Sequence, residues 1–67
     1  MDIRVFKTFI AVAENKHFGR AAETLYITQA AVSARIKQLE EFYNTQLIIR
    51  EKNNLRLTPS GEALLSH

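Results

Sequence analysis

The sequence predicts a small, mainly α-helical domain with three helices in its core, followed by a two-stranded hairpin and the opening of a fourth helix. Three observations point to this fold class. Apolar residues recur at three- and four-residue steps through residues 2–43, and a polar stretch separates two short apolar runs within residues 47–57. Thr58-Pro59 then opens a new helical pattern. At 67 residues the chain accommodates one small domain.

The first helix is expected from Asp2 to about Asn15. Asp2 is a suitable N-cap because its carboxylate accepts hydrogen bonds from first-turn amides. Asn15-Lys16-His17 is expected to interrupt the helix. The apolar stripe of this helix is predicted to comprise Ile3, Phe6, Phe9, Ile10 and Ala13.

A second helix of about two turns is predicted over residues 18–25. Gly19 stands where this helix could begin, although a hydroxyl or amide side chain would cap it better. Ala21 and Ala22 are small and therefore permit another helix to approach closely. Leu25 closes the apolar pattern.

The third helix is predicted to begin at Thr28 and to run to about Tyr43. Thr28 is expected to be its N-cap, with the hydroxyl meeting the amide of Ala31. Asn44 follows the helix and tolerates the left-handed conformation that often ends one. The residues in one sector of this helix, predicted to face the core, are Val32, Ile36, Leu39 and Tyr43.

Two short strands are predicted at residues 47–50 and 55–57, joined by the polar, turn-prone residues 51–54. Thr58 then caps a further helix, with Pro59 at the first helical position, where its missing amide costs nothing. No terminating signal follows up to the last residue, so we expect the natural chain to continue.

Two short helices joined by a tight turn and followed by a two-stranded wing form a winged helix-turn-helix. The sequence thus predicts this domain at residues 1–58. The helix-turn-helix motif is placed at residues 18–37 and the wing at residues 47–57.

Composition narrows the classes of function. The chain has no cysteine, no apolar run long enough to span a membrane and a net charge of only +2. No acid–base pair, nucleophile or phosphate loop occurs, so neither an enzyme nor a cofactor is expected, and His17 and His67 are assigned no chemistry. A protein-interaction module remains an alternative, because the first and last helices could pair chains; salt-sensitive binding to duplex DNA would exclude it.

A set of motifs occurs in register and without gaps: Phe18-x-x-Ala21-Ala22-x-x-Leu25, Thr28-Gln29-x-Ala31-Val32-Ser33-x-x-Ile36, Leu39-Glu40, Leu47-Ile48-x-Arg50 and Leu57-Thr58-x-x-Gly61. Together they resemble the N-terminal DNA-binding domain of LysR-type transcriptional regulators over essentially the whole chain. Residues 17–23 and 53–58 further resemble the HdfR-like subgroup.

The resemblance implies a bacterial, cytoplasmic regulator that binds promoter DNA as a homodimer or tetramer. Residues 59–67 would open a dimerising linker helix, and a C-terminal domain that senses a small-molecule effector would lie outside this chain. The sequence departs from the family pattern at Gly19, Ala30, Ala34 and Asn44. The changes at positions 30 and 34 affect base reading rather than the fold.

The third helix carries short polar and basic residues suited to the major groove. Gln29 can make paired hydrogen bonds to an adenine edge, Ala30 can contact a thymine methyl group, and Ser33 can serve a base or a phosphate. Arg35 and Lys37 can reach a guanine edge or the backbone, with the backbone favoured for Lys37. Arg35 could instead pair with a carboxylate such as Glu40.

The wing carries basic residues around Asn53-Asn54, which suits a tip lying along the backbone or entering a minor groove. An ordinary solvated hairpin is the alternative. Thr28 could donate its hydroxyl to a phosphate in addition to capping. The predicted DNA-binding residues are Thr28, Gln29, Ala30, Ser33, Arg35, Lys37, Arg50, Lys52, Asn53 and Arg56.

Overall fold

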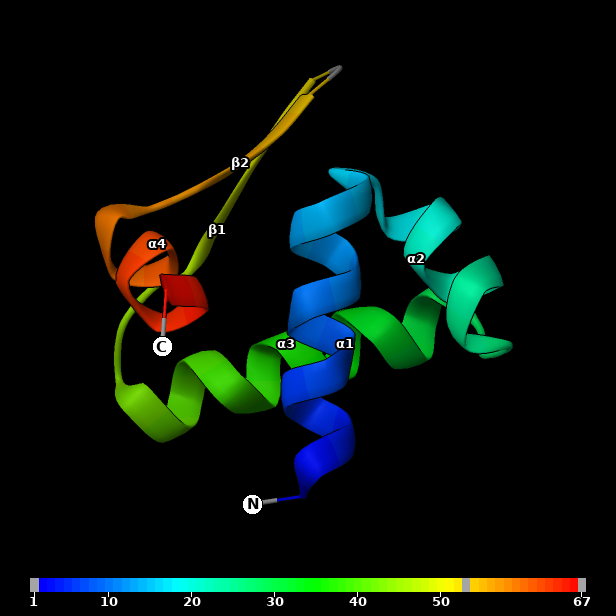
Figure 1. Ribbon diagram of the computed structural model, residues 1–67, viewed down its shortest axis with the longest axis horizontal. Coiled ribbons are helices and arrows are strands. Elements are labelled where there is room, and N and C mark those ends of the chain that lie inside the picture. The colour runs from blue at the N-terminus through cyan, green and yellow to red at the C-terminus, as the bar shows by residue number, and fades with distance from the viewer. Residues whose placement is uncertain (1, 53, 67) are drawn as a thin grey trace.

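The computed structural model describes residues 2–52 and 54–66. It confirms a mainly helical fold with a two-stranded wing (Figure 1). The elements are α1 (Ile3–Asn15), α2 (Phe18–Leu25), α3 (Gln29–Tyr43), β1 (Ile48–Glu51), β2 (Asn54–Leu57) and α4 (Pro59–Ser66). Within the described residues, no helix is both long and apolar enough to cross a membrane.

Side chains just outside the helices set where they begin. The Asp2 carboxylate accepts a hydrogen bond from the Arg4 amide at 3.0 Å, which confirms its predicted role as the cap of α1. The Thr28 hydroxyl likewise accepts from the Ala31 amide at 3.0 Å, so α3 begins where predicted. Each acceptor satisfies an amide that has no partner within its helix.

The cap of α2 differs from the prediction. The helix covers the predicted residues 18–25, but its N-cap is His17 and not Gly19; Nδ1 of His17 accepts a hydrogen bond from the Arg20 amide at 3.0 Å. An unprotonated ring nitrogen offers one lone pair, which is what a first-turn amide needs. His17 therefore has a structural role that its isolation in the sequence did not suggest.

Three helices end at a residue in the left-handed conformation. Asn44 ends α3 with φ 53°, as expected from its tolerance of this region. Lys16 and Tyr26 end α1 and α2 with φ 52° and 58°. At these two residues the backbone is in a strained conformation that glycine or asparagine would adopt more easily.

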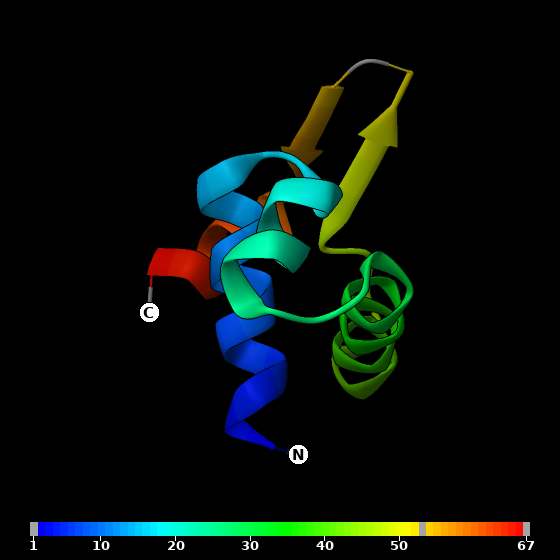
Figure 2. The same cartoon turned by 90° about the vertical axis from the view of Figure 1, so that its right-hand side faces the viewer.

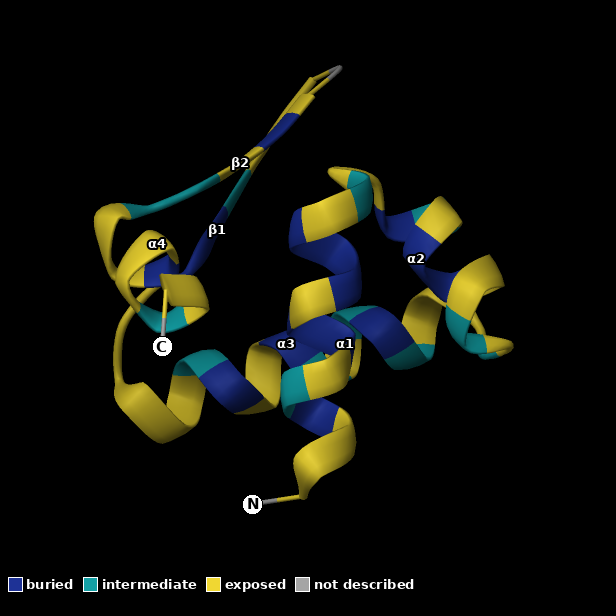
Figure 3. Ribbon diagram, viewed as in Figure 1, coloured by how far each residue is buried: buried dark blue, intermediate teal, exposed yellow. Residues whose placement is uncertain are grey.

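The core lies where α1, α2 and α3 meet (Figure 3). Val32, Ile36 and Leu39 of α3 are buried as predicted, whereas Tyr43 is 42% exposed. The predicted α1 stripe is wrong at two positions, because Ile3 is 66% and Ile10 is 42% exposed. The largest side chains with almost no exposure are Phe9, Leu39, Leu47, Val12, Val32 and Thr8.

The wing is an antiparallel hairpin in which Ile48 pairs with Leu57 and Glu51 pairs with Asn54. Relative to the predicted strands 47–50 and 55–57, β1 is shifted by one residue toward the tip and β2 begins one residue earlier. Glu51 and Asn54 therefore belong to the ladder and not to the turn. Ile48 and Leu55 are buried against the helices. Beyond them the hairpin rises away from the helical core (Figures 1 and 2).

The base of the wing is tied to α3 and α4. Oε2 of Glu40 accepts hydrogen bonds from the amides of Leu47 and Ile48 at 2.8 and 3.2 Å. The Thr58 hydroxyl accepts from the Gly61 amide at 3.0 Å, which confirms Thr58 as the cap of α4. A Cβ at Gly61 would lie 2.2 Å from the Leu47 carbonyl oxygen, so this crossing requires glycine.

Candidate nucleic-acid interface

One face of α3 is open to solvent near its N-terminus. Gln29 and Ala30 are exposed, Ser33 is half-buried, and Lys37 is exposed. Gln29, Ser33 and Lys37 follow one another at four-residue steps, so they lie along one side of the helix. The structure thus brings these four predicted site residues together. Thr28, the N-cap, lies exposed at the start of the same face.

A groove runs between this face and the wing. Its volume is about 300 Å³, and we call it the wing groove. Its polar lining consists of Lys16, His17, Gln29, Arg50, Glu51, Lys52 and Asn54. The wing groove therefore joins two predicted wing residues, Arg50 and Lys52, to the predicted base-reading residue Gln29.

Arg50 is held in place by an aromatic ring. Its guanidinium carbon lies 4.1 Å from the centre of the Phe18 ring. Such a stack is favourable because the face of an aromatic ring is electrostatically negative. Phe18 is buried at the start of α2, so this contact fixes a cation of the wing relative to the helices. A planar guanidinium keeps its edge free for a further acceptor while its face is stacked.

A second hollow, of about 370 Å³, also borders this stack. It is lined by Ser33 and Lys37 of α3 together with Phe18, Ile36, Glu40, Ile48 and Arg50. Arg50 and Phe18 line both hollows, so the stacked pair borders the hollow that contains Gln29 as well as the one that contains Ser33 and Lys37.

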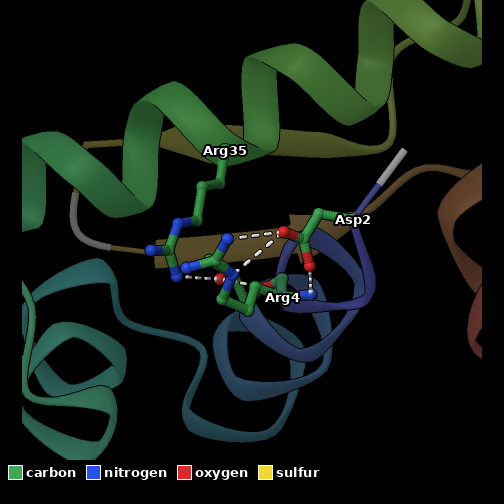
Figure 4. Close-up of polar contacts among 4 residues, drawn as sticks. Asp2, Arg4 and Arg35 are labelled. Carbon is green, nitrogen blue, oxygen red and sulfur yellow. Dashed lines mark hydrogen bonds and ion pairs between the residues drawn. The ribbon is translucent and has the colours of Figure 1, made fainter.

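Arg35 departs from the expectation. Its Nη1 donates a hydrogen bond to the hydroxyl of the fully buried Thr8 at 3.3 Å, so the side chain packs toward α1 (Figure 4). It does not pair with Glu40, whose Oε2 accepts hydrogen bonds from two amides at the base of the wing. On a 3.6-residue helix, Arg35 is turned by about 200° from Ser33, which places the two on different faces.

Of the two remaining predicted wing residues, Arg56 does not line the wing groove. Arg56 forms an ion pair with Glu51 at 2.5 Å. In the hairpin register Arg56 opposes Ile49 and Arg50 opposes Leu55, so the two arginines lie on opposite faces of the wing. Asn53 lies outside the described residues.

Sequence reasoning missed Glu51 and Asn54 on the wing side of the wing groove, and it missed Lys16 and His17 on the helix side. The latter two connect α1 to α2 and appeared to be only a helix break. Lys16 ends α1 in the left-handed conformation, and His17 caps α2, so the chain turns sharply between them. The predicted start of α2 at residue 18 could have indicated His17 as its N-cap, but that this residue lines the same groove as Gln29 follows only from the fold.

The most strongly perturbed acid lies away from the groove. Hydrogen bonds from the side chain and the amide of Arg4 lower the pKa of Asp2 to about 2. Arg35, nearby, contributes a smaller attraction in the same direction (Figure 4). Among residues 2–52 and 54–66, no group of histidine, aspartate or glutamate side chains is placed to hold a metal ion.

The fold matches solved structures closely. A BenM DNA-binding domain solved with catB site 1 DNA superposes with a TM-score of 0.93 at 35% identity, over 98% of this chain and 74% of that one. A CbnR DNA-binding domain solved with DNA gives 0.94 at 33% identity, over 98% and 76%. The oxidized form of OxyR from Corynebacterium glutamicum gives 0.93 at 40% identity, over 97% and 21%.

The sequence also matches curated proteins. It is 55% identical over its whole length to the HTH-type transcriptional regulator HdfR of Yersinia enterocolitica, and 54% identical to HdfR of Yersinia pestis. The chain spans 23% of the length of these relatives. Residues 3–62 match the family described as bacterial regulatory helix-turn-helix proteins of the lysR family. The chain belongs to this lysR family, as the resemblance in its helix and wing motifs predicted.

Proposed function

We propose that this domain binds double-stranded DNA sequence-specifically and thereby serves in transcriptional regulation. The observation that carries the proposal is the joining of Gln29 to Arg50 and Lys52 in one groove beside the exposed face of α3. Polar groups that read base edges need adjoining cations that hold the phosphates on either side. The BenM and CbnR domains, which match over almost the whole chain, were solved with DNA, and this supports the same partner here.

In this proposal α3 enters the major groove. Gln29 pairs with an adenine edge, Ala30 contacts a thymine methyl group, and Ser33 serves a base or a phosphate. Lys37 contacts the backbone. Thr28 combines capping with a phosphate contact. Arg35 receives no base-reading role, because its guanidinium is engaged by Thr8.

The wing lies along the backbone or enters the adjacent minor groove. Arg50 and Lys52 hold a strand in the wing groove, whereas Arg56 contributes less because Glu51 balances its charge. With alanine at positions 30 and 34, direct base contacts are few, so the wing supplies much of the affinity. Asn53 stays a proposed tip contact.

The proposal extends to the protein that carries this domain. Residues 1–58 form the DNA-binding domain and residues 59–67 open a linker helix that pairs two chains. The protein works in the bacterial cytoplasm, on the nucleoid when bound, as a homodimer or tetramer without catalytic activity. The remaining three quarters of a protein as long as the HdfR relatives would hold the effector-binding domain.

Selection of bound sequences from a random duplex pool tests the proposal. We expect one enriched half-site, and affinity for it that falls steeply as salt rises, because phosphate contacts release counterions. At the same salt concentration, a dimeric form of the protein should bind the selected duplex at least about 10³-fold more tightly than a scrambled duplex. A ratio of about 10³ is the lower bound typical of specific DNA-binding proteins. Equal affinity for both duplexes, or binding indifferent to salt, would contradict it.

A further inference from the structure

The imidazole of His17 has its two nitrogens in different surroundings. Nδ1 accepts the hydrogen bond from the Arg20 amide at 3.0 Å, so it carries no proton while it caps α2. A neutral imidazole has one N–H, which must then lie on Nε2. The cap therefore fixes the tautomer and leaves a single N–H donor on the opposite side of the ring.

Gly19 provides the space in which this ring lies. A Cβ at Gly19 would lie 2.9 Å from Cε1 of His17 and 3.2 Å from its Nδ1. Any larger residue would therefore displace the imidazole. The same Cβ position lies 3.6 Å from Oε1 of Gln29, so the ring sits close to the side chain that we propose reads a base.

The ring lines the wing groove, where its neighbours are cationic. Lys16 precedes it in the chain, and Arg50 and Lys52 face it from the wing. The one carboxylate that lines the groove, Glu51, is paired with Arg56. The groove thus presents three positive charges and the donor of His17 around a space open to solvent.

We infer that His17 is a DNA-contact residue whose Nε2–H donates to a phosphate oxygen of the strand held in the wing groove. This inference rests on the proposed function and adds a residue to it. Because the ring is neutral in this tautomer, its contact releases no counterion. His17 therefore adds affinity for every DNA sequence without adding to the salt dependence, unlike Arg50 and Lys52.

The test replaces His17 with serine, which caps a helix well but whose hydroxyl lies beside Cβ and therefore does not reach the position of Nε2. We expect His17→Ser to melt within a few degrees of the wild type and to bind both the selected and the scrambled duplex about ten- to a hundredfold more weakly, the usual effect of one hydrogen bond to a charged group. The slope of log affinity against log salt should stay unchanged. The control Lys52→Ala should reduce that slope by about 0.9.

A second variant separates capping from DNA contact. Gly19→Ala keeps His17 but places a methyl group where the ring lies, so it should lower the affinity for both duplexes much as His17→Ser does. In the wild type, the Nε2-bound proton of His17 should shift in the NMR spectrum on adding duplex DNA. Inorganic phosphate alone at the same phosphate concentration should leave it in place.

The outcomes are distinguishable. If the wild type binds DNA and both His17→Ser and Gly19→Ala bind it equally tightly, the inference about His17 is overturned but the proposed function is not. A reduced salt slope in His17→Ser would also overturn it, since it would mean a charged contact. An equal shift with inorganic phosphate would assign the donor to a free anion instead of a DNA strand. Failure of the wild type to bind either duplex would overturn the proposed function itself.

Discussion

Oε2 of Glu40 lies 2.8 Å from the backbone nitrogen of Leu47, so a side chain of the proposed recognition helix accepts the first amide of the wing. The same oxygen accepts from Ile48 at 3.2 Å. Leu47 is almost fully buried in the core beside this contact. The position of the wing is therefore fixed from α3 itself, and the two parts that we propose contact DNA are connected through one carboxylate.

Glu40→Ala should lower the free energy of unfolding by about 1–3 kcal/mol, because two half-buried amides lose their acceptor. Glu40→Gln keeps one acceptor oxygen without the charge and should lose about half as much. Chemical denaturation measures the stability, and amide exchange at Leu47 and Ile48 localises the change to the wing. Glu41→Ala, at an exposed neighbouring position, should stay within about 0.5 kcal/mol of the wild type. Equal losses in all three variants would argue against a specific link.

Gln29→Ala should relax the preference at one base pair by about 1–3 kcal/mol and leave affinity for scrambled DNA nearly unchanged. Gln38→Ala is a matched control: it removes the same side chain from an exposed position of α3 turned by about 180° from Gln29. Binding titrations on the selected and scrambled duplexes measure both. A loss of the same size on the two duplexes would remove the base-reading role from Gln29.

Tyr26→Gly should raise the free energy of unfolding by about 0.5–1 kcal/mol. Tyr26 has φ 58° and is 94% exposed, so glycine relieves the left-handed strain and gives up almost no packing. Asn44→Gly tests the same conformation at a residue that already tolerates it and should gain less. The urea concentrations at the unfolding midpoints of the variants and the wild type measure this effect, provided that the dependence of the unfolding free energy on urea is unchanged. A destabilised Tyr26→Gly would show that the exposed ring makes a contribution of its own.

Asp2 should make the domain sensitive to acid in a narrow range. Its pKa is lowered to about 2 in the folded chain from an ordinary 3.8, first by the side-chain hydrogen bond from Arg4. A lowered pKa contributes stability that is complete above about pH 4 and lost as the pH falls toward 2. Asp2→Asn keeps a good cap and should lack this part of the acid dependence.

The Asp2 titration can be followed directly by NMR. In Arg4→Gln the carboxyl pKa should rise toward its ordinary value, since the charged donor is gone. Arg35→Gln should produce a smaller rise, because its attraction is the weakest of the causes that lower this pKa. An Asp2 pKa unchanged in Arg4→Gln would refute the assignment of this pair.

Features that depend on neighbouring residues, such as helix caps, were predicted better than features that depend on packing between helices. The caps Asp2 and Thr28 and the left-handed Asn44 depend on a few neighbouring residues, and each was found where the sequence indicated. The α1 stripe was found only in part: Phe9 and Ala13 are buried as predicted, but the buried face also takes in Val5 and Val12 and leaves out Ile3 and Ile10. Periodicity alone cannot choose between the predicted face and this one; the helices packed against α1 do.

The proposed site was predicted in part for the same reason. Gln29, Ser33 and Lys37 follow from helical spacing alone, whereas the position of Arg35 depends on Thr8, 27 residues earlier. The stack of Arg50 on Phe18 and the inclusion of His17 in the wing groove arise only when the wing meets α2. No spacing rule in the sequence describes those contacts.

The close crossing of Gly61 over the Leu47 carbonyl has a mechanical consequence. With no room for even a methyl group, α4 cannot slide or roll against the base of the wing without opening the hydrogen bonds that Thr58 donates to the Leu47 and Gln46 carbonyls. A torque applied to α4 would turn the whole domain instead of bending the joint. In a paired assembly, the angle between the α4 helices of the two chains would thus set the distance between their two DNA-reading surfaces.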